Sequence, residues 1–143
     1  MFRKILYPTD LSDRSKKALT YIKELKNAGS EEVVILHVVD TRKLHIPEVY
    51  AITGVSVLGD KQASAAAEEA DNMAKKLNNI GIRTKIRIEK GIPFKEILRV
   101  ETEEAVSLIV IGSHGKSNVE EILWGSISKK VIRKAKGPVL IIR

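Results

Sequence analysis

The chain has 143 residues, a length that fits one domain with a single core. Of these residues 43% are hydrophobic and 30% are charged, and the formal net charge is +7. It has no cysteine, which excludes disulfides, thiol nucleophiles and thiolate metal sites and suits a reducing cytoplasm. No apolar run approaches the ~20 residues of a membrane span, and Pro8 and Asp10 interrupt the amino terminus before any signal-peptide core, so we expect a cytoplasmic protein without a membrane segment.

Five segments are predicted to be β-strands. Four are nearly continuous aliphatic runs, as expected of parallel strands that helices cover on both faces. The third, TKIRIE, alternates apolar and charged residues and is expected at a sheet edge. In chain order the predicted strands are residues 5–7, 33–39, 84–89, 108–111 and 139–142.

Helical periodicity fills the intervals between these strands. The first helix is expected to follow Ser12, a good N-cap residue, and to end at Gly29. The second covers about 60–79 and ends at Gly81, and the third begins at Pro93. The residues predicted to face the core from these helices are Ala18, Ile22, Leu25, Ala63, Ala66, Ala70, Met73, Leu77, Phe94, Ile97 and Leu98.

A fourth helix is expected to begin at Gly125 and Ser126, after residues 118–124 have looped out, and to bury Ile127, Val131 and Ile132. The order βαβαβαβαβ predicts a single doubly wound α/β domain over residues 1–143. We expect a five-stranded parallel sheet in the order 3-2-1-4-5, with helices on both faces.

One segment departs from this alternation. It runs from Thr41 to Gly59, between the second strand and the second helix. Loops of this length inside a compact domain are usually functional, and this one contains Leu, Ile, Val and Tyr residues. We interpret it as a lid or as a contact surface for a protein partner that the sequence does not identify.

The tripeptide Gly115-Lys116-Ser117 suggests a P-loop, but the strict pattern requires a glycine where Val110 stands. The dinucleotide fingerprint fails as well, because Gly112 and Gly115 supply only two of its three glycines. Another arrangement must account for these glycines.

Ligands of open parallel sheets bind beyond the carboxyl ends of the strands, where the strand order reverses. The first strand ends in Pro8-Thr9-Asp10 and the fourth in residues 112–115, so the predicted order places these two ends side by side. The glycines of the second run, together with Gly125, would let the backbone approach phosphate groups. Ser126 would open a helix whose free N–H groups attract anions. The sequence therefore predicts a phosphate cradle in two parts.

The spacing G-x-x-G, nine residues, then G-[ST] resembles the nucleotide-binding signature of the universal stress protein family. It consists here of Gly112, Gly115, Gly125 and Ser126. The stretches KILYPTDLSDRSKKAL, VVILHVVD, GIPFKEIL and GPVLIIR are similar to landmarks of that family in the same order, so the resemblance covers essentially the whole chain. It implies a member that binds ATP or AMP, with Mg²⁺ arriving on the nucleotide.

The resemblance also implies which residues bind. Pro8, Thr9 and Asp10 would border the adenosine, with Asp10 near ribose hydroxyls or a metal-bound water, and Val38 would offer backbone hydrogen bonds to adenine. Lys116 would either neutralise phosphate or remain a solvated loop charge. The residues that would line the ribose and phosphates, mostly through main-chain N–H groups, are Gly112, Ser113, His114, Gly115, Gly125, Ser126 and Ile127.

Alternative roles are considered for several of the polar residues. Asp10 could instead cap the following helix. His37 lies in an aliphatic strand and is interpreted as a satisfied core histidine. A triad of Ser126, His114 and Asp10 is disfavoured, because nothing resembles a nucleophile elbow. No spacing of histidines and acids suits a metal site.

The leading interpretation is a stress-response module that acts as a nucleotide-dependent switch, and the family resemblance implies a homodimer through the last strand, Val139–Ile142. An ATPase is the alternative. Its hydrolysis is expected to be slow or partner-dependent, because no general base or water-positioning residue is evident. A nucleic-acid-associated protein is the third. The composition disfavours it, since aromatics are only 4% and none lies among the basic residues of 129–136.

Overall fold

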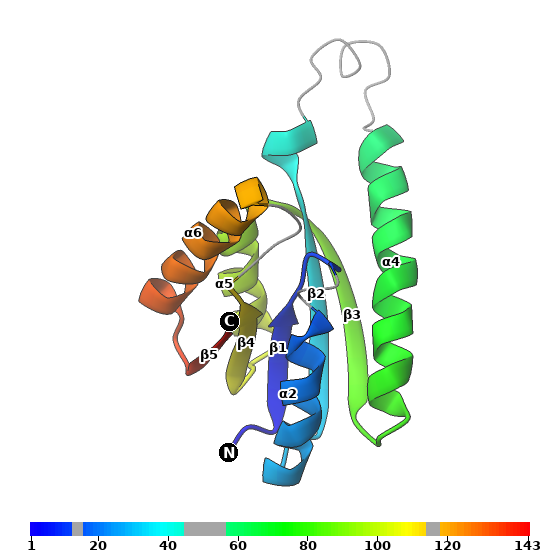
Figure 1. The fold of residues 1–143 in the computed structure, drawn as a ribbon, viewed down its shortest axis with the longest axis vertical. Helices are drawn as coiled ribbons and strands as arrows, with labels where there is room; N and C mark the ends of the chain where they lie inside the picture. The colour runs from blue at the N-terminus through cyan, green and yellow to red at the C-terminus, as the bar shows by residue number, and fades with distance from the viewer. Residues whose placement is uncertain (13–15, 45–56, 114–117) are drawn as a thin grey trace.

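The computed structural model describes residues 1–12, 16–44, 57–113 and 118–143 (Figure 1). The strands are β1 (Lys4–Pro8), β2 (Glu32–Asp40), β3 (Arg83–Gly91), β4 (Leu108–Gly112) and β5 (Val139–Ile142). The helices are α2 (Ala18–Leu25), α4 (Val57–Asn78), α5 (Pro93–Glu103) and α6 (Asn118–Lys134), with short 3₁₀ turns at Lys26–Ala28 and Thr41–Leu44. No helix among these residues is both long and apolar enough to cross a membrane.

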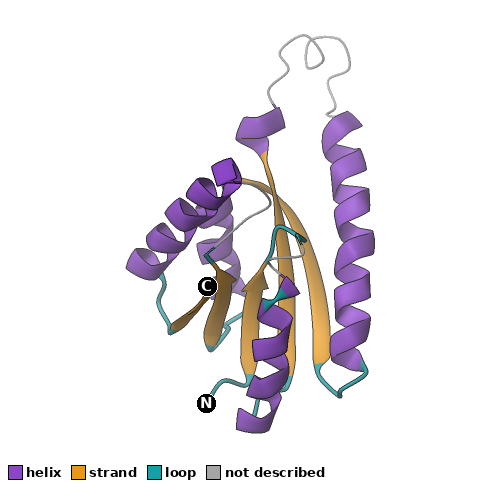
Figure 2. Ribbon diagram, viewed as in Figure 1, coloured by secondary structure: helices purple, strands orange, loops and turns teal. Residues whose placement is uncertain are grey.

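All pairings in the sheet are parallel, and the strand order β3-β2-β1-β4-β5 confirms the predicted 3-2-1-4-5 order (Figure 2). β1 lies at the centre, with Pro8 opposite Leu36 of β2 and Leu6 opposite Ile109 of β4. The alternating strand β3 is at one edge, as its pattern predicted, and β5 is at the other.

Two hydrophobic clusters cover the two faces of the sheet. Because successive side chains of a strand point to opposite faces, Ile5 and Tyr7 pack on the side of α2 and α4, while Leu6 packs on the side of α5 and α6. β2 and β4 divide their aliphatic residues in the same way. The helices contribute Ala18, Leu19, Ile22, Ala70, Met73 and Leu77 to the first cluster and Ile97, Val100, Ile127 and Val131 to the second.

Two expectations for the last helix are wrong. α6 begins at Asn118 instead of at Ser126. Residues 118–124 contain no glycine or proline, and their two glutamates near the start complement the positive end of the helix dipole, so this segment continues the helix instead of looping out. Ile132 is 52% exposed, because the helix turns Ile127 and Val131 toward the sheet and leaves Ile132 on its outer face.

The turn before β5 is fastened by a buried carboxylate from a different helix. Glu101 of α5 is 5% exposed, and its Oε1 accepts the N–H groups of Lys136 (2.9 Å) and Gly137 (3.0 Å). This contact holds the end of α6 and the start of β5 against α5.

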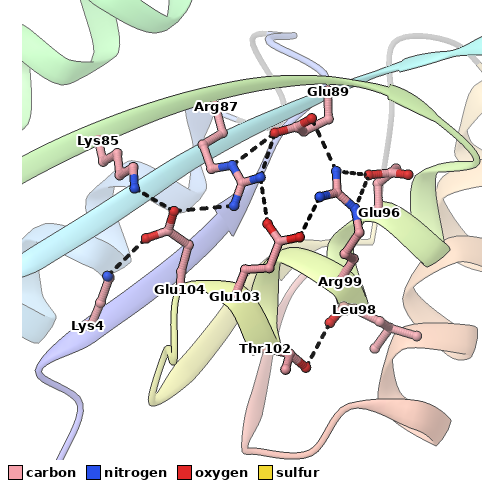
Figure 3. Close-up of polar contacts among 10 residues, drawn as sticks. All are labelled: Lys4, Lys85, Arg87, Glu89, Glu96, Leu98, Arg99, Thr102, Glu103 and Glu104. Carbon is pink, nitrogen blue, oxygen red and sulfur yellow. Dashed lines mark hydrogen bonds and ion pairs between the residues drawn. The ribbon is translucent and has the colours of Figure 1, made fainter.

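An ion-pair network joins the edge strand β3 to α5 and to β1 (Figure 3). The Glu104 side chain is 7% exposed and receives Lys85 at 2.7 Å and Lys4 at 3.0 Å. Arg87 contacts Glu104 at 3.3 Å and continues the network to Glu89 (2.7 Å) and Glu103 (2.8 Å). Lys85, together with Lys4, outweighs burial and lowers the pKa of Glu104 to about 2.

Replacing Glu104 by Gln should remove a pH-dependent part of the stability. A pKa that is lower in the folded chain than the ordinary 4.5 stabilises the fold above that pH, and this contribution is lost as the pH falls toward 2. We expect Glu104→Gln to lower the free energy of unfolding by about 1–3 kcal/mol at pH 7. The difference from the unchanged protein should shrink between pH 4.5 and pH 2 in urea titrations.

Glu24→Gln, on the exposed surface of α2, is the matched control and should leave the unfolding free energy within about 0.5 kcal/mol. A Glu104→Gln difference that is the same at pH 7 and pH 3 would contradict the assignment.

Candidate functional site

The strand order reverses between β1 and β4. The connection after β1 runs through α2 on one face, whereas the connection after β4 runs through α6 on the opposite face. At such a switch point the two connections leave the sheet in opposite directions, which is where ligands of open α/β sheets bind. Register places Thr9 beside Leu36 and one step beyond Pro8, at the carboxyl end of the sheet.

The turn after β1 is held by four successive hydrogen bonds. The N–H of Thr9 donates to Leu36 O (2.9 Å), and the Thr9 carbonyl lies 2.9 Å from Nδ1 of His37. Thr9 Oγ1 then accepts the N–H of Leu11 (2.9 Å), and Asp10 Oδ1 accepts the N–H of Ser12 (2.9 Å). Leu11 has a φ of +65°, a backbone conformation that costs a residue with a bulky side chain of the order of 1 kcal/mol or more.

Asp10 presents one carboxylate oxygen without a partner. Its Oδ1 closes the turn onto Ser12, but its Oδ2 is buried and makes no hydrogen bond with any described part of the chain. A buried acceptor that is left unpaired costs about 1–3 kcal/mol, more when it is charged, and such groups call for a ligand or water. The capping role and a ligand role for Asp10 are thus divided between its two oxygens.

Val38 directs its main chain toward the space beyond β1. Leu36 O accepts the N–H of Thr9, so the main-chain groups of Leu36 face β1. Alternate residues of a parallel strand face the same neighbour, and Val38 therefore points its N–H and C=O to the same side, two residues past the last pairing with β1. Backbone groups in this position can read the donor and acceptor edge of a base.

The acid at the end of β2 is already paired. Asp40 accepts Nε of Arg42 at 2.9 Å and Nη2 at 2.8 Å, and this bidentate contact raises the pKa of Arg42. Asp40 therefore contributes little uncompensated negative charge at the carboxyl edge, which leaves Asp10 as the acid with an unpartnered oxygen there among the described residues.

The end of β4 is tied to β5. The N–H of Ser113 donates to Ile142 O at 2.9 Å, and Ser113 Oγ lies 3.3 Å from the same carbonyl. The Ser113 amide is thus occupied by the sheet and differs from the expected phosphate donor. Gly112 is the last residue of β4, opposite Ile142. The predicted contacts of His114, Gly115 and Lys116 fall outside the described residues.

Gly125 and Ser126 lie in the interior of α6, and Ile127 packs into the core. An amide inside an α-helix already donates to the carbonyl four residues earlier. The Ser126 N–H can therefore bind phosphate only in a conformation in which α6 begins later than it does here.

The sequence did not predict the contact of His37 with the turn after β1 or the positive φ of Leu11. His37 has a hydrogen-bond partner, as predicted, but it is half-buried and lies outside the core clusters, and its partner is the turn that carries Asp10. Thr9 and Asp10 each accept, through the side chain, the N–H of the residue two positions later, as in ST- and Asx-turns. These residue types at these positions could have been predicted from the sequence. The positive φ of Leu11 had no local signal. Among the described residues, no three His, Cys, Asp or Glu side chains gather as a metal site would require.

The fold and the site geometry can be compared with known proteins. Universal stress protein MJ0577 of Methanocaldococcus jannaschii is 37% identical over 155 aligned residues, which cover all of this chain and 96% of the relative. A solved structure of MJ0577 superposes with a TM-score of 0.86 at 39% identity, covering 99% of this chain and 96% of that one.

A more distant universal stress protein from Archaeoglobus fulgidus, solved in complex with dAMP, shares the fold. Its TM-score is 0.69 at 21% identity, covering all of this chain and 98% of that one. The sequence model of the universal stress protein family matches residues 1–143. With that match from end to end and a relative of 37% identity, the chain belongs to the universal stress protein family.

Proposed function

We propose that this chain is a cytoplasmic ATP-binding module of the stress response, in which nucleotide occupancy acts as a regulatory switch. The observation that carries the proposal is the buried, unpartnered Oδ2 of Asp10 at the switch point of the sheet. An acceptor in that position fits a ribose hydroxyl or a water on nucleotide-borne Mg²⁺. AMP is the other nucleotide that this half of the site would accept.

The main chain of Val38 also supports nucleotide binding. Its outward main-chain groups lie beyond the end of β1, on the strand next to the Asp10 turn, so a base and its ribose can be engaged together. A protein of the same fold has been solved with dAMP, which contains adenine and the corresponding deoxyribose. The base and ribose half of the proposed site thus rests on residues whose placement is described.

The phosphate half rests on the glycine signature. Gly112, Gly115, Gly125 and Ser126 have the spacing of the family's nucleotide-binding motif. In the proposed complex α6 begins near Ser126, which frees amides for the phosphates, as helix N-termini require. Nucleotide binding would in this way change the length of α6, and a partner could recognise that change together with the segment predicted as a partner contact, Thr41 to Gly59, of which residues 45–56 lie outside the described part of the chain.

Replacing Asp10 by Asn should separate the two roles of its carboxylate. Asn retains an acceptor for the Ser12 N–H but places an amide where Oδ2 stood. We expect ATP affinity, measured by calorimetry, to fall about 10- to 100-fold, since hydrogen bonds to charged groups contribute about 1.5–3 kcal/mol. Asp71→Asn, at an exposed position of α4, is the control. Unchanged affinity in Asp10→Asn would remove the ribose assignment.

Valine at either signature glycine should abolish ATP binding and leave the fold intact. At Gly115 a side chain would block the approach of the backbone to phosphate. At Gly125 valine is tolerated by a helix at least as well as glycine, so a loss of binding there would not reflect unfolding. Equilibrium dialysis with ATP and thermal melts by circular dichroism provide the measurements. Retained affinity in both variants would refute the two-part cradle, and phosphate release with Mg²⁺ would instead promote the ATPase.

We also propose a homodimer through the outer edge of β5. Pro138 O accepts the N–H of Ile109 and Ile142 O accepts that of Ser113, so alternate main-chain groups of β5 face β4. By the same alternation Ile141 directs its N–H outward, to the edge where a second copy would pair.

Proline at Ile141 should therefore block the dimer without removing a hydrogen bond to β4, because the main-chain N–H that proline lacks is the one that faces outward. Sedimentation equilibrium should give twice the 15.9 kDa monomer mass for the unchanged protein and the monomer mass for Ile141→Pro. Leu140→Pro, which removes an inward group, should destabilise the fold instead. A dimer that persists in Ile141→Pro would place the interface elsewhere.

A further inference from the structure

We infer that His37 is the positioning residue of this site: its Nδ1–H holds the peptide that joins Thr9 to Asp10 and thereby aims the Asp10 carboxylate at the ligand. The inference rests on the proposed nucleotide-binding function and assigns a role to a residue that does not itself need to touch the nucleotide.

The geometry of the turn carries this assignment. Each peptide unit is planar, so fixing its N–H or its C=O fixes the direction in which the next residue leaves. From Pro8 to Ser12 four consecutive peptide units are held, by Leu36 O, by His37 Nδ1, by Thr9 Oγ1 and by Asp10 Oδ1. The second of these units is the one from which the Asp10 side chain departs.

His37 differs from the other three partners. Leu36 contributes a main-chain carbonyl, and Thr9 and Asp10 act from within the turn itself. His37 is a side chain that reaches this turn from another strand, 28 residues away in sequence. It ties the orientation of Asp10 to β2, the strand that also carries Val38, so the two elements that would meet the nucleoside keep a fixed spacing.

The chemistry of the bond determines the tautomer. A carbonyl oxygen can only accept, so the Nδ1 that lies 2.9 Å from Thr9 O must carry the hydrogen. Neutral His37 is therefore the Nδ1–H tautomer. Leu11, two residues further, has a positive φ that costs free energy, and strained residues of this kind persist where surrounding contacts hold them.

Two substitutions of His37 separate the hydrogen bond from the ring. Asn places an amide N–H close to the position of Nδ1, whereas Phe keeps a ring of similar size and lacks the donor. ATP affinity is measured by calorimetry at a temperature where every variant is folded. Ile82→Val, in the core just before the amino end of β3 and so away from the proposed site, controls for lost stability. We expect about a tenfold loss of affinity in His37→Phe and less than a threefold change in His37→Asn and Ile82→Val.

Unchanged affinity in His37→Phe, equal losses in Phe and Asn, or a comparable loss in Ile82→Val would each overturn the positioning role and leave the proposed function standing. If the unchanged protein fails to bind ATP, the proposed function fails by itself. The positioning of Asp10 is then decided by ¹⁵N spectra of the ligand-free protein. An Nδ1–H tautomer at His37, with Asp10 and Ser12 amide resonances shifted in Phe and restored in Asn, supports it, and the opposite tautomer or unmoved resonances overturn it.

Discussion

The aliphatic strands of this sheet have no face that can meet water. β1 and β4 bury almost every side chain and β2 buries Val33–Leu36 and Val39, alternately on the two sides, so helices must cover both faces. Right-handed crossovers then send α2 and α4 to one face and α5 and α6 to the other, and the direction of winding has to reverse between β1 and β4. The place where a ligand can bind is thus a consequence of covering a two-sided hydrophobic sheet.

The ion pairs of Glu104 lie near the amino end of β1, whereas the proposed nucleotide site lies beyond its carboxyl end. Glu104 joins α5 to Lys4 and Lys85 near the amino end of β1, where the network neutralises buried charge and fastens the edge strand β3. At the carboxyl end, Asp10 Oδ2 is the buried side-chain atom of the described residues that has no hydrogen-bond partner. A fold stabilised by such contacts can tolerate an unsatisfied, strained turn after β1, as binding sites commonly require.

The start of the last helix determines whether the predicted phosphate donors are available. As the structure stands, α6 runs from Asn118 and holds Gly125 and Ser126 in its interior. The same residues carry the family's phosphate-binding spacing, which calls for free amides at a helix start. A glycine inside a helix lowers its stability by about 0.5–1 kcal/mol relative to alanine, so the first turns of α6 are held only weakly against a bound anion. In the proposed switch, this contrast between helix and cradle makes α6 the element that would respond to nucleotide occupancy.

Local patterns in the sequence were enough for the strands, the doubly wound topology, the edge position of β3 and the glycine stops, because each depends on hydrophobic periodicity, crossover handedness or backbone freedom that neighbouring residues supply. The residue types of the site, above all Thr9 and Asp10 after β1, were readable for the same reason. Tertiary structure alone decided that Ile132 faces outward, since the rotation of α6 on the sheet is set by packing. It alone brought His37 to the Thr9 carbonyl across 28 residues and left Asp10 Oδ2 unpaired, because both depend on how β2 lies against β1 and on no local pattern.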